Sequence, residues 1–514
     1  PVEAIGVTAG ETLYFSAREW CGKPDDAKRP NQLARAALLS AGDYQTRAPI
    51  FPEEARRSQT TVAAARVLDA DGFLRGFLAT HSIDGARAVV FFGEEAGYSS
   101  EHVTYFDALV KSQARDGKVV TINFDTAQSL LDSPAQAVKY TGGGGQGGDA
   151  RLKDRFQPLL FGHFFNVEPV LEEFEILSYR TNVGDIDGYD AIKDKGVPLQ
   201  WDGRAFSDYA DYRLAALMDP PPPGQYMLGP QSRFALGDTP VGTVTCDGRG
   251  STLFGAFSAT TRSILRFILG SGKPLGLLFD EATFGLLPDD AIGLYVDGLE
   301  ALTKEDIANA LLAPFLAWVD TDPAGRVGIA RAGDPDAGPP VDTLVEDDIL
   351  EGWRVTPLDN PVRLSQEVTH GRNWRPMDPS EIADPAEQPL ITADIFNALQ
   401  REEEIEIAGD SGVIIPHPSA KAGPRIRGYF KEGQGAKDAA SEIFAFFGKR
   451  LNRVALPVQT YRATNMQRGR RVAVVHAEIT GGHAKNMTIF EINPSPSQGV
   501  TEIVGVMSEA PPEA

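Results

Sequence analysis

Closely spaced acidic residues are the first candidate for chemistry in this sequence. The run 185–190 (DIDGYD) offers three carboxylates, and carboxylate oxygens are the ligands that calcium prefers. An EF-hand loop needs ligands at alternate positions, a Gly at the sixth position and a Glu at the twelfth. Here Gly188 is fourth and Gly196 is twelfth. The run is therefore predicted to be a loop with Asx turns, and a calcium site of another type stays open.

A glycine-rich run offers a second candidate, a phosphate loop. Residues 270–273 read GSGK. A phosphate loop needs a Gly five residues before the second Gly of this run, and a Ser or Thr after the Lys, so that backbone N–H groups and a hydroxyl surround the phosphates. Phe267 and Pro274 occupy these two positions, which excludes the motif.

Histidine and nucleophile patterns give no further catalytic candidate. No His lies in an HExxH motif or at metal-binding spacing from Cys, and no GxSxG nucleophile elbow is present. A carboxylate-pair glycosidase stays open, because its two acids need only lie about 5 to 9.5 Å apart in space. We expect no enzyme, no cofactor and no metal site. The histidines are His81, His102, His163, His370, His417, His476 and His483.

Composition and charge limit the partners of the chain. Its 514 residues, 42% of them hydrophobic, suffice for about three or four folded domains. The formal net charge of −22 disfavours stable binding of nucleic acid, which requires a basic patch. Cys21 and Cys246 are too few for a disulfide framework and are expected to be small buried residues. We find no apolar run of membrane-spanning length and no signal-peptide pattern at the N-terminus.

Abundant Gly and Pro residues predict a β-rich chain of many short segments. Between residues 62 and 92, Asp71-Gly72 and Asp84-Gly85 are turn dipeptides between apolar runs. Residues 119–124 have high β propensity, and the glycine-rich run 142–149 is expected to be a loop or linker.

Helical periodicity is restricted to three segments, 260–269, 303–318 and 436–453. In the second, Thr303 and Asp306 form a variant of the capping box, and Pro314 should kink the helix. Near the C-terminus, two β-prone runs flank Gly481-Gly482, which predicts a hairpin.

The expected fold is mainly β with α+β parts, built from several domains that include barrel-like or tube-like units and a few short helices. The expected division is an N-terminal extension (1–60), a β-rich part (61–141), the linker (142–149), a second β-rich part (150–250), an α+β part (251–377), a polar insertion (378–430), a C-terminal helix with a β-hairpin (431–508) and a tail (509–514).

One turn links the second helical segment to a short β-prone run. An apolar segment that ends in Trp318 meets the polar residues 320–325, and residues 326–330 alternate like a strand. We expect Trp318 to be a buried apolar anchor, and Gly325 to supply the positive φ that a tight turn requires.

Several fragments, in their order along the chain, resemble tail-tip (baseplate) hub proteins of long-tailed, siphovirus-like bacteriophages and related gene transfer agents. Two positions depart from the family pattern: Phe161 stands where Tyr is usual, and His370 stands where an aromatic residue is expected. The match extends over roughly residues 60 to 480 and does not include residues 1–60. The fragments are 155–170, 189–199, 299–330, 360–376, 438–450 and 468–479.

This resemblance implies a structural role in the virion. Such hubs form homotrimeric rings at the tail tip, where they join the tail tube, the distal tail protein and the tape-measure protein to a central fibre or spike. DNA passes through the lumen only transiently during ejection into the host. The chain would be made in the bacterial cytoplasm and would not insert stably into a membrane. A lumen that conducts DNA should have an acidic or neutral lining.

Two other classes of function stay open from the sequence. One is a carbohydrate-binding or carbohydrate-degrading tail protein used in host attachment, with an aromatic groove formed by Trp201, Trp353 or Trp374. For each of these side chains the alternative is core packing. The other class is a soluble cytoplasmic enzyme of a type that the motifs do not identify.

Overall fold

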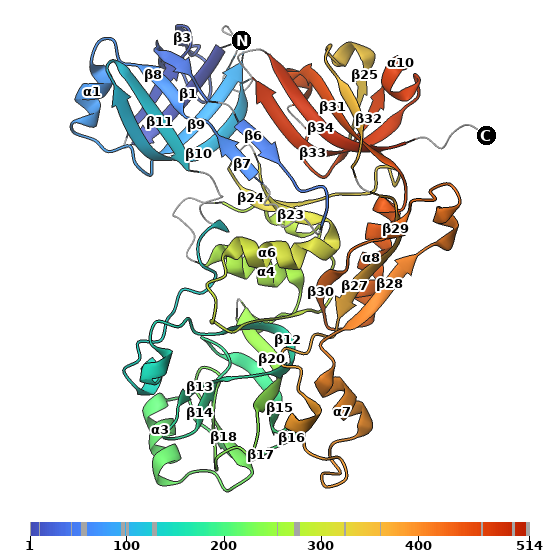
Figure 1. The fold of residues 1–514 in the computed structure, drawn as a ribbon. Coiled ribbons are helices and arrows are strands. Elements are labelled where there is room, and N and C mark those ends of the chain that lie inside the picture. The colour runs from blue at the N-terminus through green and yellow to red at the C-terminus, as the bar shows by residue number, and fades with distance from the viewer. Residues whose placement is uncertain are drawn as a thin grey trace.

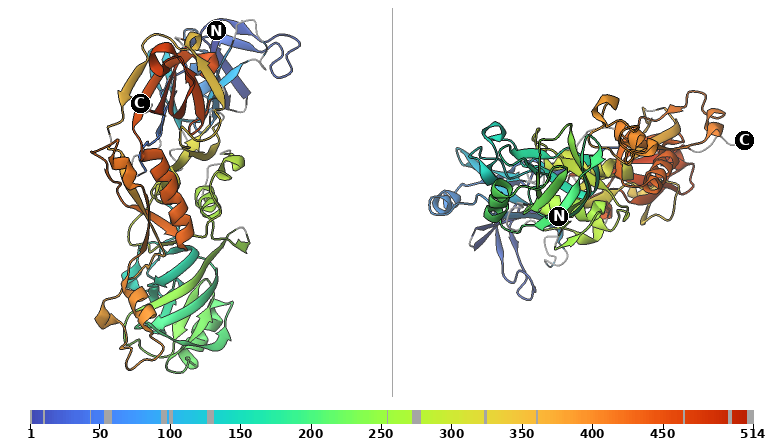
Figure 2. Two further views of the ribbon diagram at one scale, coloured as in Figure 1. Left: turned by 90° about the vertical axis from the view of Figure 1, so that its right-hand side faces the viewer. Right: turned by 90° about the horizontal axis from the view of Figure 1, so that it is seen from below.

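The fold was determined as a computed structural model, which describes residues 2–9, 11–42, 44–52, 59–93, 98, 102–125, 131–253, 255–271, 278–322, 325–359, 361–463, 466–495 and 499–509. The molecule is elongated (Figures 1 and 2). Two β units lie side by side at one end, a mixed helical and β region forms the middle, and a third β unit forms the other end. The mainly β prediction is confirmed. Each sheet is an open series of strands, so the expected barrel closure is not formed by the described strands.

The first β unit is a nine-stranded sheet in the order β3-β4-β2-β1-β9-β10-β11-β8-β5, with the helix α1 (Phe73–Leu78) beside it. The expected boundary at residue 60 cuts through this sheet, because β1 pairs with β9. Its strands are β1 (Val2–Ala9), β2 (Glu11–Ser16), β3 (Trp20–Cys21), β4 (Leu33–Ala36), β5 (Leu38–Ser40), β8 (Ala65–Leu68), β9 (Arg87–Gly93), β10 (Val103–Asp116) and β11 (Val119–Asp125).

The second β unit is an eight-stranded sheet near the C-terminus, with the main order β25-β32-β33-β34-β31-β26. β6 pairs with β33 and with β7, so two strands that lie between β5 and β8 in the sequence belong to this second sheet. The predicted hairpin is confirmed by the antiparallel pair β32–β33. The strands are β6 (Tyr44–Arg47), β7 (Gln59–Val62), β25 (Asp342–Val345), β26 (Arg354–Pro357), β31 (Leu451–Gln459), β32 (Arg471–Val475), β33 (Lys485–Ser495) and β34 (Val500–Ser508), and the short helices are η4 (Glu346–Asp348), α9 (Thr460–Ala463) and α10 (Ala477–Thr480).

The middle region surrounds a large apolar core. The helix α8 packs on the four-stranded sheet that contains β27 and β28. A two-stranded β23–β24 hairpin lies next to α6 (Figure 1). The elements are α4 (Thr261–Gly270), α5 (Glu281–Phe284), α6 (Lys304–Leu312), η3 (Ala313–Phe315), β23 (Ala317–Thr321), β24 (Val327–Arg331), β27 (Arg363–His370), β28 (Glu404–Gly409), η6 (Ser411–Ile414), β29 (Lys421–Ala422), β30 (Ile426–Phe430) and α8 (Gly433–Phe447).

The third β unit contains two sheets around one apolar cluster, to which Phe164 and Ile192 contribute from one sheet and Phe234 from the other. Their main orders are β16-β15-β20-β12-β22 and β13-β14-β19-β18-β17. The elements are η1 (Gly145–Gly147), η2 (Ala150–Leu152), β12 (Leu159–Val167), β13 (Val170–Glu173), β14 (Ser178–Arg180), β15 (Ile186–Asp194), β16 (Val197–Pro198), β17 (Gln200–Ala205), α3 (Tyr209–Met218), β18 (Gln225–Gly229), β19 (Arg233–Leu236), β20 (Val244–Leu253), β21 (Ala256–Phe257) and β22 (Gly293–Val296).

The segment expected to be a polar insertion, 378–430, contributes to the packed structure. It contains η5 (Pro379–Glu381) and α7 (Ala393–Gln400), and β28 and β30 both pair with β27. Ile382, Ile391 and Leu399 are buried in a small core of their own. The polar composition of the segment gave no sign of these apolar anchors, which pack the segment against the rest of the structure.

The helix predictions are correct in position but not always in length. The Thr303–Asp306 capping box is present: Thr303 Oγ1 accepts a hydrogen bond from the Asp306 backbone N–H at 3.1 Å, and Asp306 accepts one from the Thr303 N–H at 2.9 Å. The α6 helix ends at Leu312 and does not reach Trp318, because Pro314 cannot donate a backbone hydrogen bond and Leu316 turns left-handed. Similarly, α8 ends at Phe447, and Leu451 begins a strand.

Two glycine-containing segments have defined local structures. The turn at Gly72 leads into the α1 helix, although the sequence predicted another strand there. The run 142–149 is a folded loop, in which Gly142 N–H donates to the Gly147 carbonyl and Gly144 N–H donates to the Gly148 carbonyl. It packs within the third β unit, so it is no free linker.

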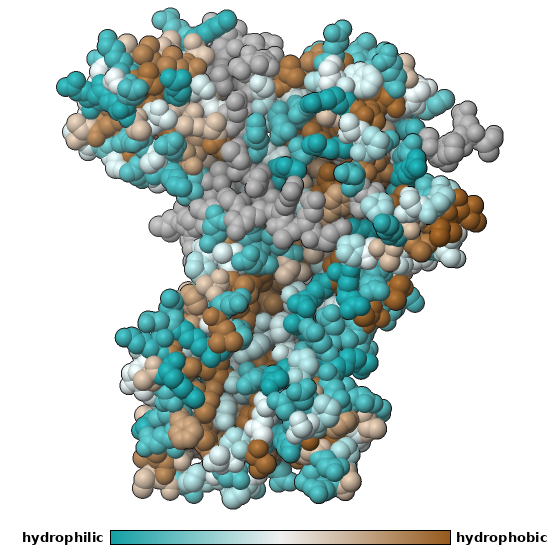
Figure 3. Space-filling view, in the orientation of Figure 1, coloured by the Kyte–Doolittle hydropathy of each residue, from teal (hydrophilic) through white to brown (hydrophobic). Residues whose placement is uncertain are grey.

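The described helices include none that is long and apolar enough to cross a membrane. Exposed apolar side chains gather on one side of the middle region, as brown patches near β28 and β29 in Figure 3. They include Ile405, Ile407, Ile414 and Ile415, the last of which is 82% exposed.

Candidate functional site

The acidic run 185–190 does not form the predicted loop, because its residues from Ile186 onward belong to strand β15. Arg249, on the neighbouring strand β20, binds the carboxylates of Asp187 and Asp190 at 2.5 and 2.8 Å. Within the described residues, no group of three or more His, Cys, Asp or Glu side chains is arranged to hold a metal ion. Two carboxylates of the run therefore compensate the positive charge of Arg249 on the neighbouring strand.

The other candidate residues are distributed over the molecule. In the glycine-rich run, Gly270 ends α4 and Ser271 follows as its cap, whereas residues 272–273 and Pro274 lie outside the described residues. Cys246 is buried, which raises the pKa of its thiol. Cys21 is exposed, so the prediction of two buried cysteines is wrong for Cys21. It ends a two-residue edge strand, where one face is open to solvent.

The three candidate tryptophans lie in different surroundings. Trp201 is 53% exposed on strand β17 of the third β unit. Trp353 packs against the core of the C-terminal sheet and meets His476 edge to face. Trp374 stacks on Tyr429 with ring centroids 6.1 Å apart. Each belongs to a different packing cluster or surface, so these side chains do not line one groove.

Three fragments of the resemblance meet at a cluster that we call the polar joint: Asn166, Lys193, Asp247 and Asn373. Asn166, the second-last residue of β12, has a φ of 55°, a left-handed conformation that Asn tolerates better than most residues. Its side-chain amide donates to Asn373 Oδ1 at 3.0 Å, and its backbone N–H donates to Asp247 Oδ1 at 2.8 Å. Lys193 pairs with the same Asp247 oxygen at 2.7 Å.

Asn373 extends the polar joint to α7, in the segment 378–430. Its amide donates to the carbonyls of Ala398 and Leu399 at 3.1 and 2.8 Å. These carbonyls lie at the C-terminal end of α7, where helix carbonyls have no partner within the helix. Asn166 and Asn373 are 0% and 1% exposed. The polar joint therefore holds the third β unit, the β27 segment and α7 in one arrangement.

Two other fragments meet at an apolar contact that we call the tryptophan joint: Trp318, Phe446 and Phe490. Trp318 on β23 is 2% exposed, and its ring stacks on that of Phe490 in the C-terminal sheet with centroids 5.6 Å apart. Phe446 of α8 meets Phe490 edge to face. The predicted burial of Trp318 is thus confirmed.

The turn beside the tryptophan joint also behaves as predicted. Gly325 has a φ of 71°, and a Cβ atom at this position would lie 2.6 Å from the Asp107 carbonyl oxygen. Asp320, on the strand before this turn, forms an ion pair with Arg468. This pair joins the 299–330 fragment to the 468–479 fragment.

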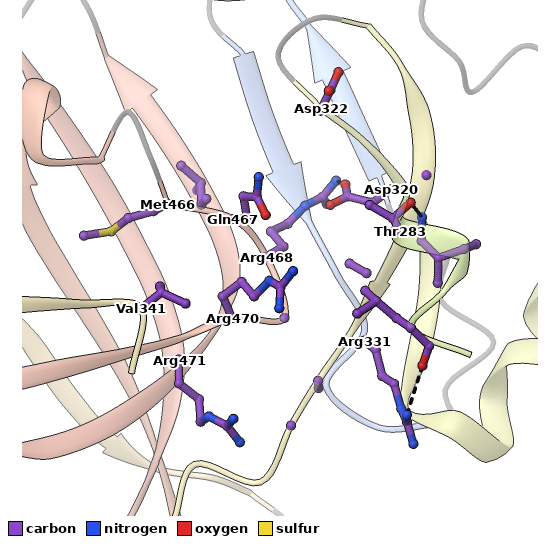
Figure 4. A pocket seen from close by; sticks show the side chains of 18 of the residues that line it. Thr283, Asp320, Asp322, Arg331, Val341, Met466, Gln467, Arg468, Arg470 and Arg471 are labelled. Atoms are coloured by element: carbon purple, nitrogen blue, oxygen red, sulfur yellow. Dashed lines mark hydrogen bonds and ion pairs between the residues drawn. The ribbon is translucent and has the colours of Figure 1, made fainter. Parts of the chain in front are cut away.

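A pocket of about 620 Å³ lies next to this ion pair (Figure 4). Its walls come from β24, from the C-terminal half of α8, and from Thr460, Ala463 and residues 466–471, together with β33 and β34. Its volume is within the range of about 300 to 1,000 Å³ that is typical of small-ligand sites. Sequence reasoning missed this pocket, because residues that are distant in the chain form its walls.

A buried ionic cluster in the third β unit also had no signal in the sequence. Glu172 accepts hydrogen bonds from Arg180 at 3.2 Å and from Arg233 at 2.5 Å, and each of the three side chains is at most 3% exposed. Burial, followed by the positive charge of Arg233, lowers the pKa of Arg180. Removing Glu172 would leave two buried guanidinium groups without a carboxylate, so this cluster is structural.

Comparisons with known proteins give structural neighbours only. The chain matches no family model, and no curated protein is similar to it in sequence. It is similar to the solved structure of a tail protein from Neisseria meningitidis, with a TM-score of 0.37, 11% identity and coverage of 99% of this chain and 97% of that chain. A 43 kDa prophage tail protein from Shewanella oneidensis has a TM-score of 0.39 and 12% identity, over 98% of both chains.

A further similar chain belongs to the virion of a native gene transfer agent particle. Its TM-score is 0.43 with 11% identity, and the match covers 70% of this chain and 87% of that chain. These structural neighbours are phage tail, prophage tail and gene-transfer-agent proteins.

Proposed function

We propose that this chain is a structural component of a bacteriophage-type tail tip, a hub that joins the tail tube and distal tail protein to a central fibre or spike. In this proposal the chain acts as a homotrimer in the virion, and DNA passes through its lumen during ejection. The tape-measure protein would be a further partner. The chain would have no catalytic role.

The observation that carries this proposal is the position of the fragments that resemble tail-tip hubs. Fragments 155–170, 189–199 and 360–376 meet at the polar joint, and fragments 299–330 and 468–479 meet at the Arg468–Asp320 ion pair. These fragments therefore connect sheets and helices within an elongated body. A protein that transmits mechanical load through an assembly requires such connections between its units.

Exposed apolar edges give a second reason to expect a multi-chain assembly. Among the described strands, β28 has a neighbour on one side only, β27. Its outward residues Ile405 and Ile407 are 38% and 57% exposed, and Ile414 and Ile415 lie on the segment that follows. An unpaired strand edge with exposed apolar residues is a ready site for contact with another chain.

The alternative of a sugar-binding or sugar-degrading tail protein lacks a specific supporting observation. It would require aromatic side chains along one groove, and the three candidate tryptophans occupy separate surroundings. We therefore develop the structural proposal only.

Immunogold electron microscopy of particles from the source lysate, with an antibody against this chain, tests the location. We expect gold label only at the end of the tail. A chain that stays soluble in the cell while the particles carry no label would contradict the proposal, and hydrolase assays would then be the next step.

The trimer has its own test, by light scattering on the purified protein. We expect a mass three times that of the 55.4 kDa chain. Ile407→Lys places a charge on the exposed edge and should reduce this mass, whereas Leu214→Lys, on the exposed face of α3, should not if β28 is the contact. A monomer at micromolar concentration would contradict self-association.

A further inference from the structure

The pocket beside the tryptophan joint has an uneven balance of charges. Five carboxylates line it, and each forms an ion pair with a basic side chain. Asp280 and Asp322 share Arg326, whose ion pairs measure 3.7 and 2.7 Å. The other pairs are Asp320 with Arg468, Glu442 with Arg331 and Asp334 with Lys449. Each lining carboxylate therefore already has a cationic partner, and two of the five share Arg326.

Two arginines of the lining have no carboxylate partner within the described part of the chain. Arg471 donates one hydrogen bond to the Asp334 backbone carbonyl at 3.1 Å, and that carbonyl carries no formal charge. Arg470 is exposed, and its guanidinium makes no ion pair with any described residue. Consequently, the 470–471 end of the pocket carries excess positive charge.

The orientation of these side chains directs that charge into the pocket. In Figure 4, Arg468 and Arg470 extend from the segment 466–471 toward the opposite wall, which carries Arg331. Arg468 and Arg331 are occupied by Asp320 and Glu442, so Arg470 is the guanidinium available to a bound molecule.

The remaining surface of the pocket is largely apolar. Leu316 and Ile329 line it from the middle region, and Val341, Met466 and Ile492 line it from the C-terminal unit. Together with the free guanidinium, this lining matches a molecule that has an apolar body and one anionic end. A planar carboxylate fits the paired N–H groups of a guanidinium. With five carboxylates nearby, a single negative charge is favoured over the double charge of a phosphate.

We propose that this pocket is a binding site for a carboxylate on an apolar body, with Arg470 as the residue that binds the carboxylate. The carboxylate can come from two sources, a free small molecule or the C-terminus of a protein segment. This proposal does not depend on the assignment to a phage tail.

Isothermal titration calorimetry on the full chain tests the site. The first probes are octanoate and its neutral analogue octanamide, which share the apolar body and differ in the charged end. We expect octanoate to bind more tightly than octanamide. Arg470→Gln should weaken octanoate binding about tenfold, because a hydrogen-bonded ion pair is lost, and should leave octanamide binding unchanged.

Arg18→Gln is the matched control. Arg18 is also an exposed arginine with no ion pair to any described residue, and it lies in the N-terminal unit, away from the pocket lining. This variant should bind octanoate like the wild type. Equal affinity of octanoate and octanamide, absence of octanoate binding, or unchanged octanoate affinity in Arg470→Gln would each overturn the proposal.

A second pair of probes distinguishes the source of the carboxylate. Acetyl-Leu-Leu with a free C-terminal carboxylate is compared with the same dipeptide as its amide. Tighter binding of the free dipeptide than of octanoate, lost in Arg470→Gln, supports capture of a protein C-terminus. Tighter binding of octanoate than of the free dipeptide, again lost in Arg470→Gln, supports a free small molecule.

Discussion

The polar joint and the tryptophan joint hold the same body together by different physical means. The polar joint uses directional hydrogen bonds of buried side chains, and Asn373 contacts both β12 and α7. The tryptophan joint uses ring stacking and burial of apolar surface. A hydrogen-bonded joint fixes one relative orientation of its units, because misaligned buried donors would lose their partners. An apolar joint contributes stability with weaker directional demands.

The largest expected effect is that of Trp318→Ala, in the tryptophan joint. Removing this buried ring should lower the free energy of unfolding by about 3 to 5 kcal/mol, because it leaves a cavity against Phe490. Trp201→Ala, at an exposed position, should change it by no more than about 0.5 kcal/mol. Urea denaturation measures both. A Trp318→Ala midpoint equal to that of the wild type would contradict the role of the ring.

A smaller loss is expected from Asn373→Ala, in the polar joint. Truncation leaves the Asn166 amide and the two α7 carbonyls without this partner, which should destabilise the fold by about 2 to 3 kcal/mol. Asn397→Ala is the matched control, because Asn397 is an exposed Asn of the same helix. The same denaturation experiment applies, and equal effects of the two variants would show that the buried hydrogen bonds carry little stability.

Combining Trp318→Ala with Asn373→Ala tests whether the joints are independent. The two joints have no residue in common, so their effects should add to within about 0.5 kcal/mol. A larger coupling energy in a double-mutant cycle would indicate that the middle region transmits strain between the two joints.

The smallest effect concerns pH and lies near the polar joint. Burial, followed by the charge of Lys431, lowers the pKa of His163 on β12 from its ordinary value of 6.5. The unfolded chain then binds a proton at a higher pH than the folded chain, so stability should fall as pH falls below 6.5 toward the folded pKa. His163→Gln should flatten this part of the stability profile. An unchanged slope between pH 7 and the folded pKa would rule out this contribution of His163.

Local features of the fold could be predicted from the sequence because neighbouring residues determine them. The Thr303–Asp306 capping box needs only two residues spaced three apart, and the positive φ of Gly325 follows from a tight turn. The burial of Trp318 followed from an apolar run that leads into it. Each of these predictions depends on a few adjacent residues.

Long-range features could not be predicted, because no local pattern encodes them. Thr46 hydrogen bonds to the carbonyl of Ile492, 446 residues away in sequence, and Asn166 meets Asn373 across 207 residues. The core of the 378–430 segment was hidden by its polar composition. The order of the 142–149 loop depends on hydrogen bonds among its own glycines and on packing against the third β unit.

Our central claim is that the fragments resembling tail-tip hubs join the units of the fold. Hydrogen exchange of the Asn373→Ala variant tests this claim most directly. Backbone amides of residues 164–167 on β12 and 398–400 on α7 should exchange faster together, because both depend on Asn373, while β23 and β24 keep their protection. Asn397→Ala should leave all these segments unchanged. Faster exchange on only one side of the joint would contradict the claim.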